Sequence, residues 1–394
     1  MSVTSIPDHH PPILTHSAAE RSAGAEGSGR PQPTTLPALT GMRWLAAALV
    51  FAFHICVVEY FDRSVEDTIL RPLFGSGDTG VSFFFILSGF VLAWSARPGD
   101  RPVRFWRRRL ARVYPLHLVT ALLALLLAVT VWPETDLSAL QIVSNLLLVH
   151  SWNPDYHYSQ SLNPVSWSLA CEAFFYGLFP LLMPMVRRLR PGSLYAVGLG
   201  CVVAVVLVPL VAGGTWVHFV PAARLPEFVL GIVLAELVRG GHWRGPGLGV
   251  SCGVLLIGYA AAEWVPPVLG FAACTVLGFA LVIPAAATAE LRGRVTWLAH
   301  PVMVRLGELS FAFYMIHIIV MRTGESLFTP HPQLATLPAL GATAAAFTVS
   351  LALSWALYVL VERPARRFLL GRRSSGPAAP RQATETAIPT GRIG

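Results

Sequence analysis

Long apolar runs of about twenty residues, separated by short polar segments, follow one another from residue 41 to residue 360. A run of this length crosses the hydrocarbon core of a bilayer as a helix. The pattern predicts ten membrane spans, at roughly 41–60, 79–96, 115–132, 165–186, 194–212, 219–238, 247–262, 266–288, 306–322 and 337–360. An apolar stretch at 137–150 is too short to cross alone, so we expect an interfacial or partly buried helix there. The sequence therefore predicts an all-α polytopic membrane protein.

Both ends of the chain differ from this central part. Residues 1–38 and 371–394 are rich in Pro, Gly, Ser, Thr and Ala and poor in large apolar residues, which is typical of disordered tails. A single transmembrane domain is expected over 39–370. The N-terminus shows no short apolar region followed by a small-residue cleavage site, so the first span is expected to direct insertion.

The distribution of arginines predicts the orientation of the spans. All 29 basic residues are Arg. With the N-terminus in the cytoplasm, 25 of them fall in cytoplasmic segments, three in outer segments and one within a span. Short cytoplasmic loops of membrane proteins carry an excess of positive charge. The asymmetry therefore predicts that both termini are cytoplasmic and that the chain lies in the cell membrane.

Composition narrows the class of partner. The chain is 54% hydrophobic and 13% charged, and its net charge of +8 comes from arginines between apolar runs. This placement argues for contact with a lipid bilayer and against a nucleic-acid partner. The five cysteines lie in or beside apolar stretches without the spacing of metal ligands, so no metal site is expected.

Two polar residues stand out in the first span, Arg43 and His54. Eleven helical residues correspond to roughly 16 Å along the axis, which puts His54 near mid-bilayer if Arg43 lies at the surface. A titratable residue at that depth costs free energy and marks a functional site by default. The alternative is a core histidine that hydrogen-bonds to a neighbouring helix.

A few more polar residues interrupt the later spans. They are Ser88, Glu172, Arg224, Glu227, Tyr314 and His317. Ser88 and Gly89 are explained as well by close helix packing as by chemistry. Glu172 needs a partner because an isolated buried charge is too costly. Arg224 and Glu227 are three residues apart and either pair with each other or line a cavity.

The segment 104–115, RFWRRRLARVYP, is the most basic part of the chain and is expected to form a cytoplasmic loop. Its arginines either encode topology and bind anionic lipid headgroups, or receive a polyphosphorylated substrate. Pro115 is expected in the first turn of the next helix, where proline is favoured.

Several motifs in order carry a family resemblance. They are Arg43 with His54; Gly80, Phe83, Phe84, Ser88, Gly89 and Phe90; Arg108, Arg112 and Pro115; Trp167, Ser168, Leu169 and Glu172; Arg224, Glu227 and Phe228; and Ser310, Tyr314 and His317. The chain resembles the transmembrane acyltransferase-3 family, the O-antigen acetylase-like integral membrane acyltransferases, over roughly residues 38–370. It departs from the family where Phe311 follows Ser310, a position that is usually tyrosine.

The resemblance implies transfer of an acyl group from acyl-CoA, used as a co-substrate, to a hydroxyl of a sugar, a polysaccharide or an antibiotic such as a macrolide. No bound cofactor is expected. On this interpretation His54 is the general base, and Glu172, Ser88 and His317 are further catalytic candidates. The donor-binding candidates are Arg43, Arg108 and Arg112. The candidates that shape the cavity for the acceptor are Trp167, Arg224, Glu227 and Tyr314.

A transporter or flippase of a glycan or lipid-linked substrate is the alternative, because such proteins also place His, Arg and Glu within the membrane. Transporters commonly show two related halves, and the sequence shows no such pairing.

Overall fold

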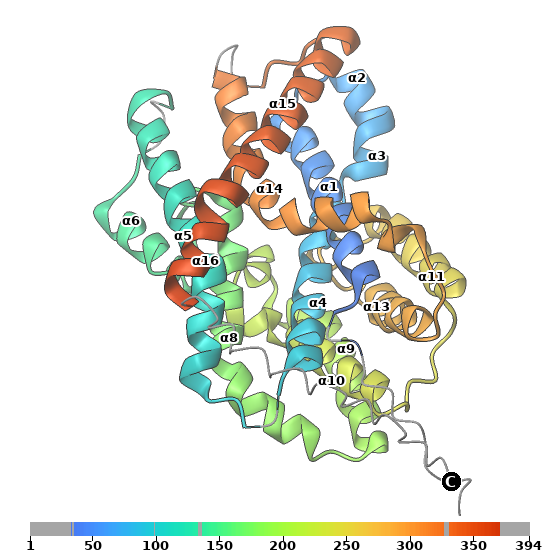
Figure 1. Ribbon diagram of the computed structural model, residues 1–394. Coiled ribbons are helices and arrows are strands. Elements are labelled where there is room, and N and C mark those ends of the chain that lie inside the picture. Colours follow the sequence, from blue (N-terminus) through green and yellow to red (C-terminus); the bar gives the residue numbers. More distant parts are fainter. Residues whose placement is uncertain (1–32, 34, 98, 133–135, 327–330, 371–394) are drawn as a thin grey trace, which may run out of the picture. The chain divides into compact units, whose positions relative to one another are not determined.

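The computed structural model describes residues 33, 35–97, 99–132, 136–326 and 331–370 of the 394-residue chain (Figure 1). These residues form helices joined by turns, and within them the only strand-like feature is an isolated bridge between Phe61 and Leu334. The all-α polytopic fold is confirmed. The tails expected over 1–38 and 371–394 lie outside the described residues, apart from residues 33 and 35–38.

A helix coincides with each of the ten expected spans. These helices are α1 (Pro37–Val58), α4 (Gly80–Ser95), α5 (Pro102–Thr130), α8 (Trp167–Arg187), α9 (Pro191–Ala212), α10 (Pro221–Arg239), α11 (Leu248–Ala261), α13 (Val276–Leu291), α14 (Pro301–Ser326) and α15 (Thr336–Leu357). Within the described part of the chain, seven helical stretches are long and apolar enough to cross a membrane. The three other helices are not among these seven. The stretches that contain α11 and α13 are apolar but shorter, and α10 carries the charged pair Arg224 and Glu227.

Short helices connect these elements. The α-helical ones are α2 (Arg63–Val65), α3 (Arg71–Phe74), α6 (Ala139–Leu146), α7 (Tyr156–Ser159), α12 (Pro267–Gly270) and α16 (Arg363–Leu370). The 3-10 helices are η3 (Gly77–Thr79), η4 (His150–Trp152), η5 (Pro164–Ser166), η6 (Thr215–His218), η7 (Ala262–Trp264) and η8 (Trp297–Ala299). Two π-helical turns are η2 (Glu66–Leu70) and η9 (Tyr358–Glu362). The stretch 137–150 is helical as expected, since α6 lies within it and begins with a capping box at Ser138 and Gln141.

The arginine-rich segment 104–115 forms the first half of a helix, so the expectation of a loop there is wrong. α5 begins at Pro102, whose ring fits the first helical position, and it continues through Pro115. The expectation that Pro115 starts a helix is therefore also wrong. A proline inside a helix removes one backbone hydrogen bond, a loss that helices of membrane proteins tolerate where neighbouring groups compensate.

The expected span at 266–288 is interrupted. Pro267 starts the short helix α12, which ends at Gly270, and α13 begins only at Val276. The pair Pro266–Pro267 explains where α12 begins, because residues that precede a proline avoid the helical region.

The helices pack most closely where glycines face a neighbouring backbone. A Cβ added to Gly231 of α10 would lie 1.9 Å from the carbonyl oxygen of Ile86 in α4, and one added to Gly89 would lie 2.0 Å from that of Phe228. The same holds between α14 and α1, where a Cβ on Gly307 would lie 1.9 Å from the oxygen of Thr40. Small residues allow such approach between membrane helices, and the packing notch expected at Gly89 is confirmed.

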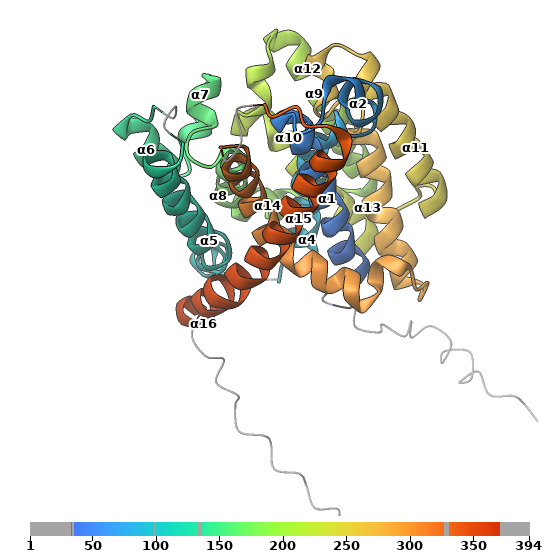
Figure 2. The ribbon, with the colours of Figure 1, turned by 90° about the horizontal axis from the view of Figure 1, so that it is seen from above.

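The helices α1 and α4 lie between two groups of helices. In both views α5, α6 and α16 lie on one side of them and α11 and α13 on the other (Figures 1 and 2). α1 packs along α14, and aromatic rings join the two, with Phe51 and Phe313 at 5.6 Å between centroids and Trp44 and Phe313 at 5.0 Å. This packing brings the polar residues of α1 and α14 together.

Candidate active site

His54 of α1 and His317 of α14 are in direct contact. The Nδ1 atom of His54 lies 3.2 Å from the Nε2 atom of His317, although the residues are 263 positions apart in sequence. His317 is completely buried and its ring stacks on Phe313 at 6.0 Å between centroids. Both histidines lie beyond the midpoint of their helices, because α1 begins at Pro37 and α14 at Pro301, earlier than the expected residues 41 and 306.

The hydrogen bonds of this pair determine which ring nitrogens carry protons. His317 Nδ1 lies 2.8 Å from the carbonyl oxygen of Tyr314, and His54 Nδ1 lies 2.8 Å from that of Val50. Because a carbonyl oxygen only accepts, both Nδ1 atoms are donors, and in a neutral imidazole the Nε2 atom is then an acceptor. His54 Nδ1–H is therefore shared between Val50 and His317 Nε2. Its own Nε2 keeps a lone pair, and within the described part of the chain no hydrogen bond occupies it.

Tyr314 connects this pair to α8. Its ring centroid lies 5.9 Å from that of His317, and its hydroxyl lies 2.9 Å from the hydroxyl of Ser168. It also donates to the carbonyl oxygen of Val165 at 3.2 Å. Trp167, beside Ser168, packs edge-to-face on Phe219 at 5.1 Å and on Phe85 at 6.0 Å.

A second group combines arginines with carboxylates. The guanidinium of Arg43 in α1 interacts electrostatically with Arg112 of α5, Glu172 of α8 and Glu362 of η9. Glu172 interacts in turn with Arg43, Arg112 and Arg109. Positive charge exceeds negative charge in this group, which suits an anionic ligand. The structure thus brings together Arg43, Arg112 and Glu172 of the residues expected from the sequence.

Tyr176 links Ser88 to this charged group. Its hydroxyl donates to Oε2 of Glu172 at 2.7 Å and is also hydrogen-bonded to Ser88 of α4. The backbone oxygen of Tyr176 accepts from the indole N–H of Trp106 in α5 at 2.9 Å. Ser88 therefore faces a polar group, while its neighbour Gly89 provides the packing notch.

Arg108 occupies a different position from Arg112. It forms an ion pair with Asp100, the residue two positions before α5, with Nη1 donating to Oδ1 at 3.3 Å. This hydrogen-bonded guanidinium holds the pKa of the Asp100 carboxyl below its usual range. Arg108 therefore lies near the N-terminal end of α5 with its charge partly neutralised.

The structure places Arg224 and Glu227 in the interface of α4 and α10. They form an ion pair with Nε of Arg224 and Oε2 of Glu227 at 3.0 Å, and both are almost fully buried. Arg224 also donates to the hydroxyl of Ser82 at 2.8 Å and lies over the ring of Phe85 at 5.3 Å. The expectation that the two residues pair with each other is confirmed, and the pair joins α10 to α4 through Ser82.

Three residues of this site are absent from the set expected on the basis of sequence, namely Arg109, Tyr176 and Glu362. Arg109 precedes Arg112 by three residues, a spacing that places both on one face of a helix. Because a loop was expected over 104–115, this helical spacing was not recognised. Glu362 is a lone carboxylate at the end of an apolar run, which is the type of residue that marks a site in a membrane protein.

Comparison of the sequence with known proteins identifies a family of acyltransferases. The family model described as an acyltransferase domain, that of acyltransferase-3, matches residues 36–359. Acyltransferase MdmB of Streptomyces mycarofaciens is 40% identical over 91% of this chain and 98% of its own length. The exopolysaccharide production protein ExoZ of Rhizobium meliloti is 27% identical over 79% of this chain and 96% of its own length.

The O-acetyltransferase OatA of Staphylococcus aureus is also 27% identical, over 52% of this chain and 35% of its own length. No solved structure matches the chain. The family match covers most of the chain and includes every site residue described above except Glu362. The chain therefore belongs to the acyltransferase-3 family and is a multi-pass membrane O-acyltransferase.

Proposed function

We propose that the protein transfers an acyl group from acyl-CoA to a hydroxyl of a sugar, a polysaccharide or an antibiotic such as a macrolide. The proposal places it in the cell membrane with both termini in the cytoplasm, so that Arg43 is near the cytoplasmic side. The arginine distribution supports this orientation. Proteins named for acyl transfer, O-acetyl transfer and exopolysaccharide production are among its relatives.

The observation that carries the mechanism is the free lone pair on His54 Nε2. An alcohol becomes a good nucleophile when a base removes its proton, and histidine suits this task. His54 is held by Val50 and His317 through Nδ1, so its Nε2 is oriented to accept a proton. His317 is a positioning residue. Its own Nδ1–H donates to helix carbonyl oxygens, and its Nε2 accepts a hydrogen bond from His54 Nδ1–H.

The transfer then balances in atoms and charge. The acceptor O–H gives its proton to His54 Nε2 while its oxygen forms a bond to the thioester carbonyl carbon. The C–S bond breaks and the CoA sulfur leaves as a thiolate. The proton held by His54 passes to that sulfur, which gives the ester and free CoA.

Ser88 offers a second route, in which it acts as a covalent nucleophile and holds the acyl group until the acceptor takes it. Its hydrogen bond to Tyr176 fits a polar environment for that role.

The arginine group is proposed to bind the phosphates of the donor. A guanidinium presents donors in a planar fork that fits phosphate oxygens. Arg43 and Arg112 lie beside Glu172, whose negative charge offsets the repulsion between the two guanidinium groups. Glu172 in turn accepts a hydrogen bond from Tyr176. Arg108 would meet the donor earlier, near the N-terminal end of α5. Trp167 and Tyr314 are proposed to line the acceptor side, with Arg224 and Glu227 fixing the helices behind it.

The test is acyl-CoA-dependent formation of product by the purified protein in detergent, where no gradient exists. Candidate acceptors are incubated with the protein and a panel of short acyl-CoAs, and the products are read by mass spectrometry. An acceptor whose mass rises by one acyl group supports the proposal. A protein that binds acceptors but acylates none of them from any acyl-CoA would refute it.

A further inference from the structure

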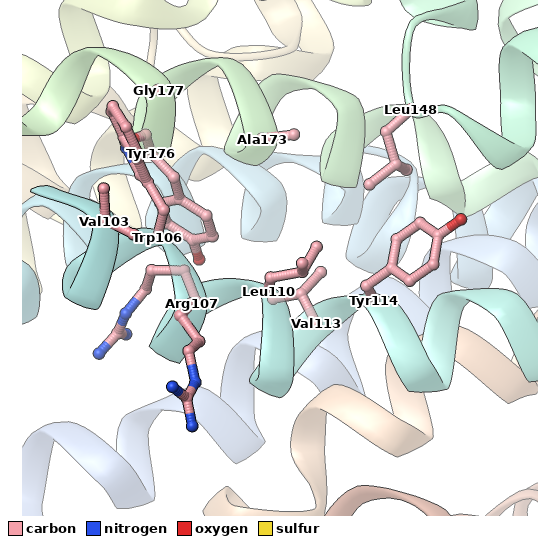
Figure 3. Close-up of a pocket in the computed structure, with 11 residues that line it drawn as sticks. Val103, Trp106, Arg107, Leu110, Val113, Tyr114, Leu148, Ala173, Tyr176 and Gly177 are labelled. Atoms are coloured by element: carbon pink, nitrogen blue, oxygen red, sulfur yellow. The ribbon is translucent and has the colours of Figure 1, made fainter. Parts of the chain in front are cut away.

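A groove runs between α5 and α8 on the surface of the helical domain (Figure 3). It has a volume of about 480 Å³, and most of the side chains that line it are apolar. Trp106 and Tyr176 lie side by side at one end, and Tyr114 and Leu148 lie at the other. Beyond Trp106 the two helices close on each other, since the rings of Phe105 and Phe179 stack at 4.8 Å between centroids. The groove is therefore bounded at that end.

Two of the three residues of α8 that line the groove are small. Ala173 and Gly177 are four positions apart, so they lie on one face of the helix, and both are exposed. A Cβ added to Gly177 would meet no atom within 4 Å. Across from them, Trp106 and Leu110 of α5 are also exposed. The space between the helices exists because α8 has small side chains where α5 has large ones.

The groove and the proposed donor site share two residues. Tyr176 lines the groove, and its hydroxyl is bonded to Glu172 and Ser88. Arg109 also lines the groove and interacts electrostatically with Arg112 and Glu172. An apolar chain that lies in the groove would therefore have its polar end beside Tyr176 and the arginines.

The charges at the groove define the occupant. Arg107 and Arg109 are the charged residues that line it, so it attracts an anionic amphiphile and disfavours a cationic one. An acyl-CoA has this chemistry, because its phosphorylated nucleotide is joined through the pantetheine arm and a thioester to an apolar chain. The groove volume of about 480 Å³ is far larger than the methyl group of an acetyl donor needs.

We infer that the groove between α5 and α8 holds the acyl chain of the donor, and that the enzyme accepts acyl groups longer than acetyl. Ala173 and Gly177 set the length limit. This inference rests on the proposed function, because it assumes an acyl-CoA donor. The reaction balances as described above, with a longer chain on the carbonyl carbon that is transferred. Membrane lipid is the competing occupant, and it would give no dependence of donor affinity on chain length.

The experiment measures donor affinity of the full-length protein in lipid nanodiscs. The probes are non-transferable thioether analogues of acetyl-CoA, butyryl-CoA and hexanoyl-CoA, in which a methylene separates the sulfur from the carbonyl. Burial of a methylene raises affinity by up to about fourfold. We expect the hexanoyl analogue to bind the natural protein at least about tenfold more tightly than the acetyl analogue, with empty nanodiscs as the blank for membrane partitioning.

Two variants fill the groove, Gly177→Leu and Ala173→Leu. They are expected to reduce the ratio of hexanoyl to acetyl affinity by at least about fivefold, because the larger side chains take the place of the acyl carbons. Gly200→Leu is the matched control, since Gly200 lies inside α9 and a Cβ there also meets no atom within 4 Å. It should leave the ratio unchanged.

The outcomes separate the two proposals. A chain-length ratio that is flat in the natural protein, or that survives both groove variants, would overturn the groove inference while leaving acyl-CoA as the donor. Failure of the natural protein to bind any of the three analogues would overturn the proposed function, and the groove inference with it.

Discussion

The Nδ1 atom of His54 and the Nε2 atom of His317 lie 3.2 Å apart across the interface of α1 and α14. The carbonyl oxygens of Tyr314 and Val50 fix the proton of each ring on Nδ1. The result is a chain of hydrogen bonds that runs from α14 to α1 and ends at the free Nε2 of His54. In the proposed mechanism His317 therefore orients His54, and His54 accepts the proton.

Replacement of His54 by alanine is expected to lower the rate of acyl transfer by about 10²- to 10⁴-fold, the usual contribution of a general base. Donor affinity should change little, because the base meets the acceptor hydroxyl rather than CoA. The measurement is kcat together with the Kd for acyl-CoA in the purified variant. Near-normal turnover in His54→Ala would remove His54 from the role of base.

His317 is expected to tolerate some polar replacements better than apolar ones. In His317→Gln the amide oxygen still accepts from His54 Nδ1–H, whereas His317→Leu leaves that donor with Val50 alone. We expect His317→Leu to lose about 10- to 100-fold in kcat and His317→Gln to retain more of it, both with KM near that of the natural protein. A catalytic role for His317 itself would show as equal loss in both variants.

The three candidate donor-binding arginines are expected to differ. Arg43 and Arg112 lie together beside Glu172, whereas Arg108 is paired with Asp100. Removal of a charge-assisted hydrogen bond costs about 1.5–3 kcal/mol, so Arg43→Ala and Arg112→Ala should each weaken binding of acyl-CoA by about 10- to 100-fold. Arg108→Ala should weaken it less. Equal effects of all three substitutions would show that the phosphates contact Arg108 as closely as the group around Glu172.

Gly231 is expected to be essential for the packing of α10 against α4. A methyl group at this position would lie 1.9 Å from the carbonyl oxygen of Ile86 and 2.8 Å from the nitrogen of Phe90, both backbone atoms. Gly231→Ala should therefore lower stability by about 1–3 kcal/mol or prevent folding. Gly200→Ala is the control, because its site is open. It should be neutral or stabilising in thermal unfolding of the purified protein.

Hydrophobic pattern alone located the spans, because a bilayer requires long apolar helices whatever their partners. It failed where a helix continues through polar residues, as in α5, since the arginines before Pro115 interrupt the apolar run without interrupting the helix. It also missed the helical turns after Asp62, whose side chain caps α2 by accepting from the backbone nitrogens of Ser64 and Val65.

Most single residues of the site were predictable from the sequence, but contacts between different helices were not. His54 and His317 were each unusual in an apolar context, yet their contact depends on how α1 and α14 pack, which no local pattern encodes. The same is true of Tyr176, which became significant only through its bonds to Glu172 and Ser88. Arg224 and Glu227 were predictable as a pair because one helix carries both.

Two buried histidines outside the ten expected spans predict a loss of stability in mild acid. Burial lowers the pKa of His150 to about 3, and it does the same for His218, which stacks on Phe271 at 4.1 Å. An unfolded histidine takes up a proton near pH 6.5. Between about pH 6.5 and pH 3 the unfolded state therefore binds more protons than the folded state, and stability falls as the pH falls through this range.

The expected size of this effect for His150 is on the order of 2 kcal/mol between pH 7 and pH 5, because the proton binds almost only the unfolded chain. The measurement is the difference in Tm between these two pH values for the purified protein. His150→Gln cannot titrate and retains a group that can bond to Ser166, whose hydroxyl lies 3.3 Å from His150 Nε2. It should lose less stability on acidification. His157→Gln, at an exposed position in α7, is the control and should behave as the natural protein does. If His150→Gln lost as much stability between pH 7 and pH 5 as this control, His150 would be protonated in the folded state and its burial would not oppose the charge.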